Sequence, residues 1–130
     1  PGTIGSIPMI LASNESVITE LVNKNLYLSK SDWDSFENSW DFQHHPLICK
    51  VPTIAEAFSQ WQAECEDRFQ QLKANEEELN RIFIDIYGLQ DELMPEVEDK
   101  DVTVRKADLS RDIRSFISYD SWLYVWSLFS

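Results

Sequence analysis

An apolar stripe between residues 53 and 88 constrains this chain more than any other feature of its sequence. Its positions step by four and three residues without a slip, and no proline or glycine interrupts it before Gly88. This spacing places side chains on one face of an α-helix. We therefore predict a mainly α fold, a helical domain built round a long helix or a helical hairpin over residues 52–88. The stripe comprises Ile54, Phe58, Trp61, Cys65, Arg68, Leu72, Asn75, Leu79, Ile82 and Ile86, widened by Phe69 and Phe83.

Two polar residues leave open whether the apolar stripe forms one continuous helix. Arg68 and Asn75 stand on it, and we expect imperfect packing on a helical neighbour at these positions. A break near residues 73–75 would give two helices in place of one, and the sequence does not decide between them. Gly88 is the predicted helix stop, because glycine readily adopts the left-handed conformation that ends many helices.

Residues 1–50 predict small helices and a loop. Residues 4–11 form a short apolar run that Pro8 interrupts, which indicates a weak extended segment. Ser13 is a predicted helix N-cap, and helical spacing continues to about Asn23.

After this helix, residues 26–28 predict a brief strand or an extended link. A second short helix is expected to begin at Ser29 or Ser31 and to end within residues 41–46, which close on a proline. Its predicted apolar side carries Trp33, Phe36 and Trp40.

The C-terminal part predicts a linker and a last helix. Residues 89–106 are acidic at first, contain Pro95, and end in the alternating stretch 101–105, which is typical of an edge strand. Residues 107–130 predict a C-terminal helix with Leu109, Ile113, Phe116 and Ile117 at helical spacing. We thus expect residues 1–130 to form one helical domain with at most one or two short strands.

The charge of the chain excludes several partners. The net charge is −12, and residues 52–99 hold 13 acids against three bases, whereas residues 101–130 hold four of each. Affinity for nucleic acid comes mainly from Lys and Arg, so we expect no binding of the isolated chain to DNA or RNA. An anionic membrane surface is equally unfavourable, and residues 122–129 are too short to span a bilayer.

The ends and cysteines of the chain indicate its setting. Two cysteines are too few for a disulfide framework and favour a reducing cytosol, so we expect a cytoplasmic location. The chain begins Pro-Gly-Thr without an initiator Met, which indicates either a trimmed chain or a domain cut from a longer polypeptide.

Candidate chemical groups are few. The three glycines cannot form a phosphate loop. The candidate nucleophile and base residues are His44, His45 and Cys49. Together with Cys65, they are also the candidate zinc ligands. Their spacing is that of neither a paired C-x-x-C nor an H-x-x-x-H knuckle, so a polar loop and a buried thiol are the favoured interpretation.

The acids and aromatics also favour structural interpretations. Consecutive acids on a helix fan out around it, whereas acid–base or metal chemistry needs them to converge. Base stacking needs Lys or Arg between the aromatics, and here their neighbours are acidic. We therefore predict no catalytic, cofactor-binding or metal residue. The acids concerned are Glu64, Glu66, Asp67, Glu76, Glu77, Glu78, Asp91, Glu92, Asp99 and Asp101; the aromatics are Trp33, Phe36, Trp40, Phe42, Phe58 and Trp61.

Three stretches carry a family resemblance. Residues 29–37 read S-K-S-D-W-D-S-F-E and run on to S-W-D-F at 39–42. Residues 73–90 read K-A-N-E-E-E-L-N-R-I-F-I-D-I-Y-G-L-Q, and D-V-T-V-R begins a third stretch at 101–119. Over residues from about 4 to 119, the chain resembles the PglX-type adenine-specific DNA methyltransferases of BREX phage-defence systems and related single-chain restriction–modification enzymes.

The resemblance implies methyl transfer from S-adenosylmethionine to the exocyclic amine of adenine in DNA. The family's cofactor pocket, and the Asn-Pro-Pro-Tyr loop that holds the flipped adenine, have no counterpart in this sequence, so no site residue and no cofactor is carried over. The chain resembles the region that follows the catalytic core, a helical connection towards target recognition.

The resemblance stops after Tyr119. The family pattern continues A-V-G-C-M-F-G-R-Y-S, whereas residues 120–129 read D-S-W-L-Y-V-W-S-L-F. Codons AGT TGG TTG TAT GTT TGG TCG CTA encode residues 121–128 and, read one base later, encode V-G-C-M-F-G-R. We expect a frameshifted, truncated product whose tail is out of family register, and which favours dimers if the tail does not pack.

The leading hypothesis is a fragment that is no enzyme by itself, at most a spacer or interaction module between catalytic and target-recognition parts. Its expected partners are proteins of a defence complex or a second copy bound through apolar helix faces. The alternatives are an acidic protein that mimics DNA and a helical dimerisation domain that uses residues 54–86.

Overall fold

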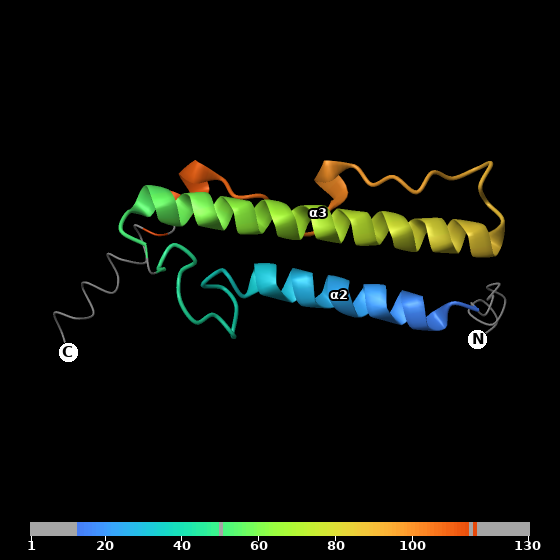
Figure 1. Ribbon diagram of the computed structural model, residues 1–130, viewed down its shortest axis with the longest axis horizontal. Helices are drawn as coiled ribbons and strands as arrows, with labels where there is room; N and C mark the ends of the chain where they lie inside the picture. The colour runs from blue at the N-terminus through green and yellow to red at the C-terminus, as the bar shows by residue number, and fades with distance from the viewer. Residues whose placement is uncertain (1–12, 50, 115, 117–130) are drawn as a thin grey trace.

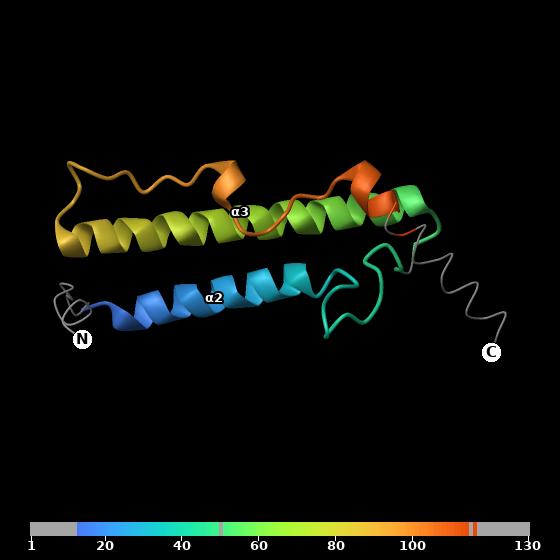
Figure 2. The ribbon, with the colours of Figure 1, turned by 180° about the vertical axis from the view of Figure 1, so that it is seen from behind.

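A computed structural model describes residues 13–49, 51–114 and 116 of the chain. Its elements are α2 (Glu15–Trp33), α3 (Ile54–Tyr87) and the short 3₁₀ helix η1 (Asp99–Asp101), followed by helical residues at 109–114 and 116. α2 and α3 lie side by side and run in opposite directions, and the chain then returns along another flank of α3 (Figures 1 and 2). These residues contain no strand, so the prediction of a mainly α fold is confirmed.

α3 is one helix of 34 residues, which decides the alternative that the sequence left open. Thr53 caps its start, since the Thr53 hydroxyl accepts the Glu56 N–H at 3.2 Å. Gly88 ends it with a left-handed φ of 66°, as predicted. No break occurs near residues 73–75. At 1.5 Å per residue the helix is about 51 Å long.

α2 is also a single helix, of 19 residues, so the predicted extended link at residues 26–28 is wrong. No proline or glycine lies within residues 15–33, and the inward positions keep helical spacing throughout. The N-cap is Asn14 rather than the predicted Ser13, and the Asn14 side chain makes no capping hydrogen bond. The inner face of α2 consists of Ile18, Leu21, Asn25, Leu28 and Asp32, all half-buried or buried.

Trp33, Phe36 and Trp40 do not share one side of a second short helix, contrary to the prediction. α2 ends at Trp33, and the turns after it leave Trp40 fully exposed. The Ser39 hydroxyl donates to the Asp34 carboxylate at 2.5 Å and fixes the first of these turns. Short polar side chains favour turns over helix through such local bonds, so a second helix does not form.

Residues 95–98 run antiparallel to α3 as extended chain and lead into η1 at Asp99. Two extended residues span roughly 6.6 Å and one helical turn spans about 5.4 Å, so the segment advances two residues for each turn of α3. Polar side chains hold each step. Asn80 Nδ2 donates to the Pro95 carbonyl at 3.1 Å, the Val97 N–H donates to the Glu77 carboxylate at 3.1 Å, and Lys73 Nζ donates to the Asp99 carboxylate at 2.7 Å.

Residues 101–105 alternate in burial, but they form no edge strand. Val102 and Val104 are buried, while the residues beside them are exposed. The two valines pack with Phe69 and Leu72 of α3, not against a neighbouring strand. The period of two therefore indicates an extended chain with one buried side, and here a helix buries that side.

The core lies where the apolar stripe of α3 meets the other segments. Its outer positions Ile54 and Phe83 are about half exposed, whereas the middle is buried, as predicted. None of the described helices is both long and apolar enough to cross a membrane. The predictions for residues 4–11 and for the chain beyond residue 116 lie outside the described residues. The two buried clusters are Leu47, Ala57, Trp61 and Cys65, and Phe69, Leu72, Val102 and Val104.

We expect Leu72→Ala to lower the free energy of unfolding by about 2–5 kcal/mol, because Leu72 is only 1% exposed and its loss leaves a cavity between α3 and the returning segment. Urea denaturation followed by circular dichroism measures the effect. The control, Gln71→Ala on the exposed side of the same turn, should change stability by less than about 0.5 kcal/mol. Equal losses in both variants would contradict the assigned core.

Candidate functional site

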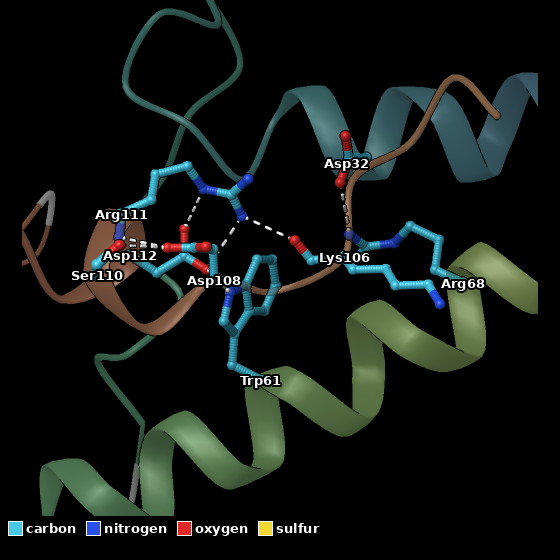
Figure 3. A network of polar contacts seen from close by, with 8 residues as sticks. All are labelled: Asp32, Trp61, Arg68, Lys106, Asp108, Ser110, Arg111 and Asp112. Carbon is cyan, nitrogen blue, oxygen red and sulfur yellow. Dashed lines mark hydrogen bonds and ion pairs between the residues drawn. The ribbon is translucent and has the colours of Figure 1, made fainter. Parts of the chain in front are cut away.

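The densest set of polar contacts lies where α2, α3 and residues 105–112 meet (Figure 3). We call it the three-way junction. It joins segments that are far apart in the sequence and is the natural place to look for chemistry. Its members are Asp32, Trp61, Arg68, Lys106, Asp108, Arg111 and Asp112.

The first contact of the junction links the two long helices. Arg68 Nη1 lies 3.3 Å from Asp32 Oδ1, with only 14% and 12% of the two side chains exposed. The Arg68 guanidinium also lies 5.5 Å from the centre of the Trp61 ring. The pKa of the Asp32 carboxyl is raised above its ordinary value. Burial is the largest cause, and it outweighs the opposing effects of the Arg68 charge and the Arg105 backbone N–H.

The second contact centres on Asp112, which is 2% exposed. Its carboxylate accepts the Trp61 indole N–H at 3.3 Å and the Asp108 backbone N–H at 2.9 Å. Arg111 adds bonds from Nε at 2.7 Å and from Nη2 at 3.1 Å. One buried carboxylate thus binds α3, the start of the last helix and a guanidinium together, and its acceptor sites are occupied.

Asp108 and Arg111 complete the junction at the start of the last helix. The Asp108 carboxylate accepts the Arg111 backbone N–H at 2.8 Å, as an N-cap does. Arg111 Nη2 donates to the Lys106 carbonyl at 3.0 Å, and its guanidinium lies 5.7 Å from the centre of the Phe36 ring. The arginine therefore satisfies the backbone of the returning segment and covers an aromatic face at once.

Of the histidines and cysteines considered above, His44 and Cys49 line a surface groove beside Trp61, whereas His45 and Cys65 are buried. Cys65 is 1% exposed, and burial raises the pKa of its thiol to about 12, so it is an unreactive core residue. Cys49 and His44 are exposed in the loop. Among the described residues, no three His, Cys, Asp or Glu side chains lie close enough to hold a metal ion.

His45 has a structural position. It is 7% exposed, its Nδ1 accepts the Leu47 N–H at 3.2 Å, and its ring meets the Phe116 ring edge-on at 5.3 Å between centres. Burial lowers the pKa of His45, although the nearby Asp112 carboxylate opposes this effect. A neutral imidazole is therefore favoured in the folded chain.

The acids of α3 spread around the helix and bind within the chain. Glu78 pairs with Arg81, Glu66 accepts from Gln70 at 2.9 Å, and Asp67 accepts from Gln71 at 2.7 Å. Of the candidate aromatics, Trp61 is buried and Trp40 and Trp33 are exposed in acidic surroundings. Glu66, Asp67 and Glu78 therefore do not converge on one point.

The polar groove beside Trp61 does not offer what S-adenosylmethionine, the cofactor that the family resemblance implies, requires. Such a ligand needs an enclosed, largely apolar pocket with free polar groups that bind its ribose and amino acid ends. The acids that line this groove are Asp34, Asp41 and Glu64, and Lys30 pairs with the first two, at 2.5 and 2.6 Å. No step of methyl transfer can be derived from these groups.

The sequence signalled the junction only in part. Arg68 on the apolar stripe was recognised as polar, and Asp112 stands at helical spacing between Leu109 and Phe116. A charged residue at an apolar position indicates a buried partner. The partners themselves, Asp32 at 36 residues and Trp61 at 51 residues of separation, could not be read from spacing.

Comparison with known proteins bears out the resemblance. The chain is 53% identical over 124 residues to the adenine-specific methyltransferase PglX of Lacticaseibacillus casei (strain Zhang), covering 91% of this chain and 10% of that protein. It is 27% identical over 86 residues to the adenine-specific methyltransferase BrxX of Escherichia coli O9:H4 (strain HS), covering 66% of this chain and 7% of that protein. The predicted similarity to PglX-type methyltransferases is confirmed, and the chain spans about a tenth of such relatives. No family model and no solved structure matches it.

Asp112→Ala should lower the free energy of unfolding by about 3 kcal/mol, because it leaves the Trp61 indole N–H and the Asp108 N–H buried without their acceptor. Asp101→Ala removes an equal charge from an exposed position and should change stability by less than about 0.5 kcal/mol. Urea titrations of both variants measure the difference. A loss as small for Asp112→Ala as for the control would argue against the junction.

Lowering the pH from 7.5 to 5.5 should destabilise the chain through His45. Its folded pKa lies below the ordinary value of 6.5, so the unfolded chain binds the proton more readily. The stability that this group contributes is present above pH 6.5 and is lost as the pH falls through the folded pKa. His45→Gln should flatten the dependence, measured by urea unfolding at each pH, whereas the exposed control His44→Gln should keep it. Parallel curves for wild type and His45→Gln would refute this role.

Proposed function

We propose that the chain is a non-catalytic spacer and interaction module of an adenine-specific DNA methyltransferase, located between the catalytic part and the target-recognition part. The parent enzyme would transfer a methyl group from S-adenosylmethionine to adenine and serve phage defence in the cytoplasm. The similarity to PglX and BrxX supports the parent, and the small share of those proteins that the chain spans supports a role as one module.

The three-way junction is the observation that carries the spacer role. Its buried polar groups bind one another, as Asp112 does with Trp61 and Arg111, so they serve rigidity and leave no reactive group free. The chain crosses the molecule three times, along α2, along α3 and along the returning segment (Figure 1). The start of α2 therefore lies near the end of α3, whereas Phe116 packs at the start of α3 with Ala57, so the two ends of the described chain are far apart, as a spacer requires.

The rival functions fit these contacts less well. A dimer through the middle of the apolar stripe would require α2 and the returning segment to leave α3, because Trp61 and Leu72 are buried within the chain. A mimic of DNA needs free acids in a regular array, whereas Glu78 and Asp99 pair with basic residues of the same chain.

Two assays test the proposal. The purified chain, mixed with unmethylated DNA and S-adenosylmethionine labelled on the methyl group, should transfer no label above the blank. In Lacticaseibacillus casei PglX, replacing the matching segment with this chain should retain genomic adenine methylation, and replacing it with a Gly-Ser linker of equal length should lower methylation by about tenfold or more, because reacting groups must be held in position. Methyl transfer by the isolated chain, or full activity with the linker, would overturn the proposal.

A further inference from the structure

The far end of α3 from the three-way junction carries an apolar cleft that the junction does not use. It lies between the last turns of α3 and residues 89–94 and has a volume of about 380 Å³. Its large side chains are unusually open to solvent, with Met94 80% and Leu93 52% exposed. We call it the distal cleft. Its lining consists of Asn80, Phe83, Ile84, Tyr87, Leu89, Leu93 and Met94.

Hydrogen bonds hold the walls of the distal cleft in place. The N–H groups of Glu92 and Leu93 both donate to the Leu89 carbonyl at 3.0 Å, which closes the turn after Gly88. Asn80 Nδ2 reaches the Pro95 carbonyl at 3.1 Å and ties the loop back to the helix. A cleft whose walls are already fixed binds a partner at a lower entropic cost.

The rim of the distal cleft is acidic and largely uncompensated. Asp91, Glu92 and Glu96 lie within two residues of the lining residues Leu89, Leu93 and Met94 along the chain. All three acids are exposed, and no ion pair joins them to a basic residue in the part of the chain that the structure describes. The nearby base, Arg81, is already paired with Glu78. An apolar floor within a negative rim attracts apolar side chains that are flanked by positive charge.

We propose that the distal cleft docks a basic amphipathic protein segment, with one or two large apolar residues in the cleft and Lys or Arg at the rim. A second copy of the chain would bring the same acids to the rim, and residues 4–11 of this chain carry no charge to pair with it. The inference rests on the proposed role as an interaction module and names its partner. It can fail while the methyl-transfer assays still give their expected results, because it concerns binding alone.

The test uses the full chain and a fluorescein-labelled 18-residue helical peptide of Leu and Lys with all Leu on one face. Fluorescence anisotropy should show saturable binding that weakens with salt and that the Leu/Glu peptide of the same pattern does not reproduce. Leu93→Ser combined with Met94→Gln removes the apolar anchors without changing the charge and should raise Kd about tenfold or more, as loss of an anchor pocket does. Hydrogen exchange should show protection over residues 80–94.

A matched control keeps the test specific. Leu109→Ser removes an apolar side chain of 60% exposure outside the cleft and should leave Kd within about twofold. Equal binding of the Leu/Glu peptide, or an unchanged Kd in the double variant, would overturn the proposal. The proposal would also be overturned if the peptide bound only to the variant that combines Ile7→Asp with Ile10→Asp, because residues 4–11 would then occupy the distal cleft in the wild type. A mass that rises with concentration in wild type and not in the double variant would assign the cleft to a second copy and overturn it equally.

Discussion

The broad apolar face of α3 is the constraint on which the rest of the structure depends. A helix of 34 residues does not gain its stability from backbone propensity alone, so its apolar stripe has to be covered. α2 covers one flank, and the returning segment covers the next. The charged groups Asp32, Arg68 and Asp112 lie at the points where these covers meet, and mutual hydrogen bonds make their burial tolerable. Packing and polar pairing are therefore parts of one arrangement.

The elements that sequence reasoning predicted are those governed by local chemistry. The helical stretch of α3 and its Gly88 stop follow from apolar spacing and from the backbone preference of glycine, whereas the Thr53 cap was not predicted. α2 was divided wrongly, because residues 26–28 were interpreted as a strand or extended link. Leu26 and Tyr27 are exposed, Leu28 continues the inner face, and no proline or glycine interrupts the helix here. The alternation at residues 101–105 predicted the buried side correctly and the element wrongly.

From the sequence, the three-way junction could be predicted only as charged residues at otherwise apolar positions. Spacing showed that Arg68 interrupts an apolar stripe, and it placed Cys65 in the core, where the structure finds it. It could not indicate that Arg68 meets Asp32, or that Trp61 donates to Asp112, since such pairs depend on how distant segments come together. The distal cleft was hidden for the same reason: its floor joins the end of α3 to a loop that the sequence described only as an acidic linker.

The path of the chain has a mechanical consequence. Because α2, α3 and the returning segment lie lengthwise against one another, a pull on the two ends of the described chain acts parallel to their contacts (Figure 2). The load is then shared as shear among the Asp32–Arg68 pair, the contacts of Asp112 and the polar steps along residues 95–99, which would have to yield together. A two-helix hairpin, whose ends leave from the same side, would instead peel open one turn at a time. The third traverse thus makes the unit resistant to extension along its own axis.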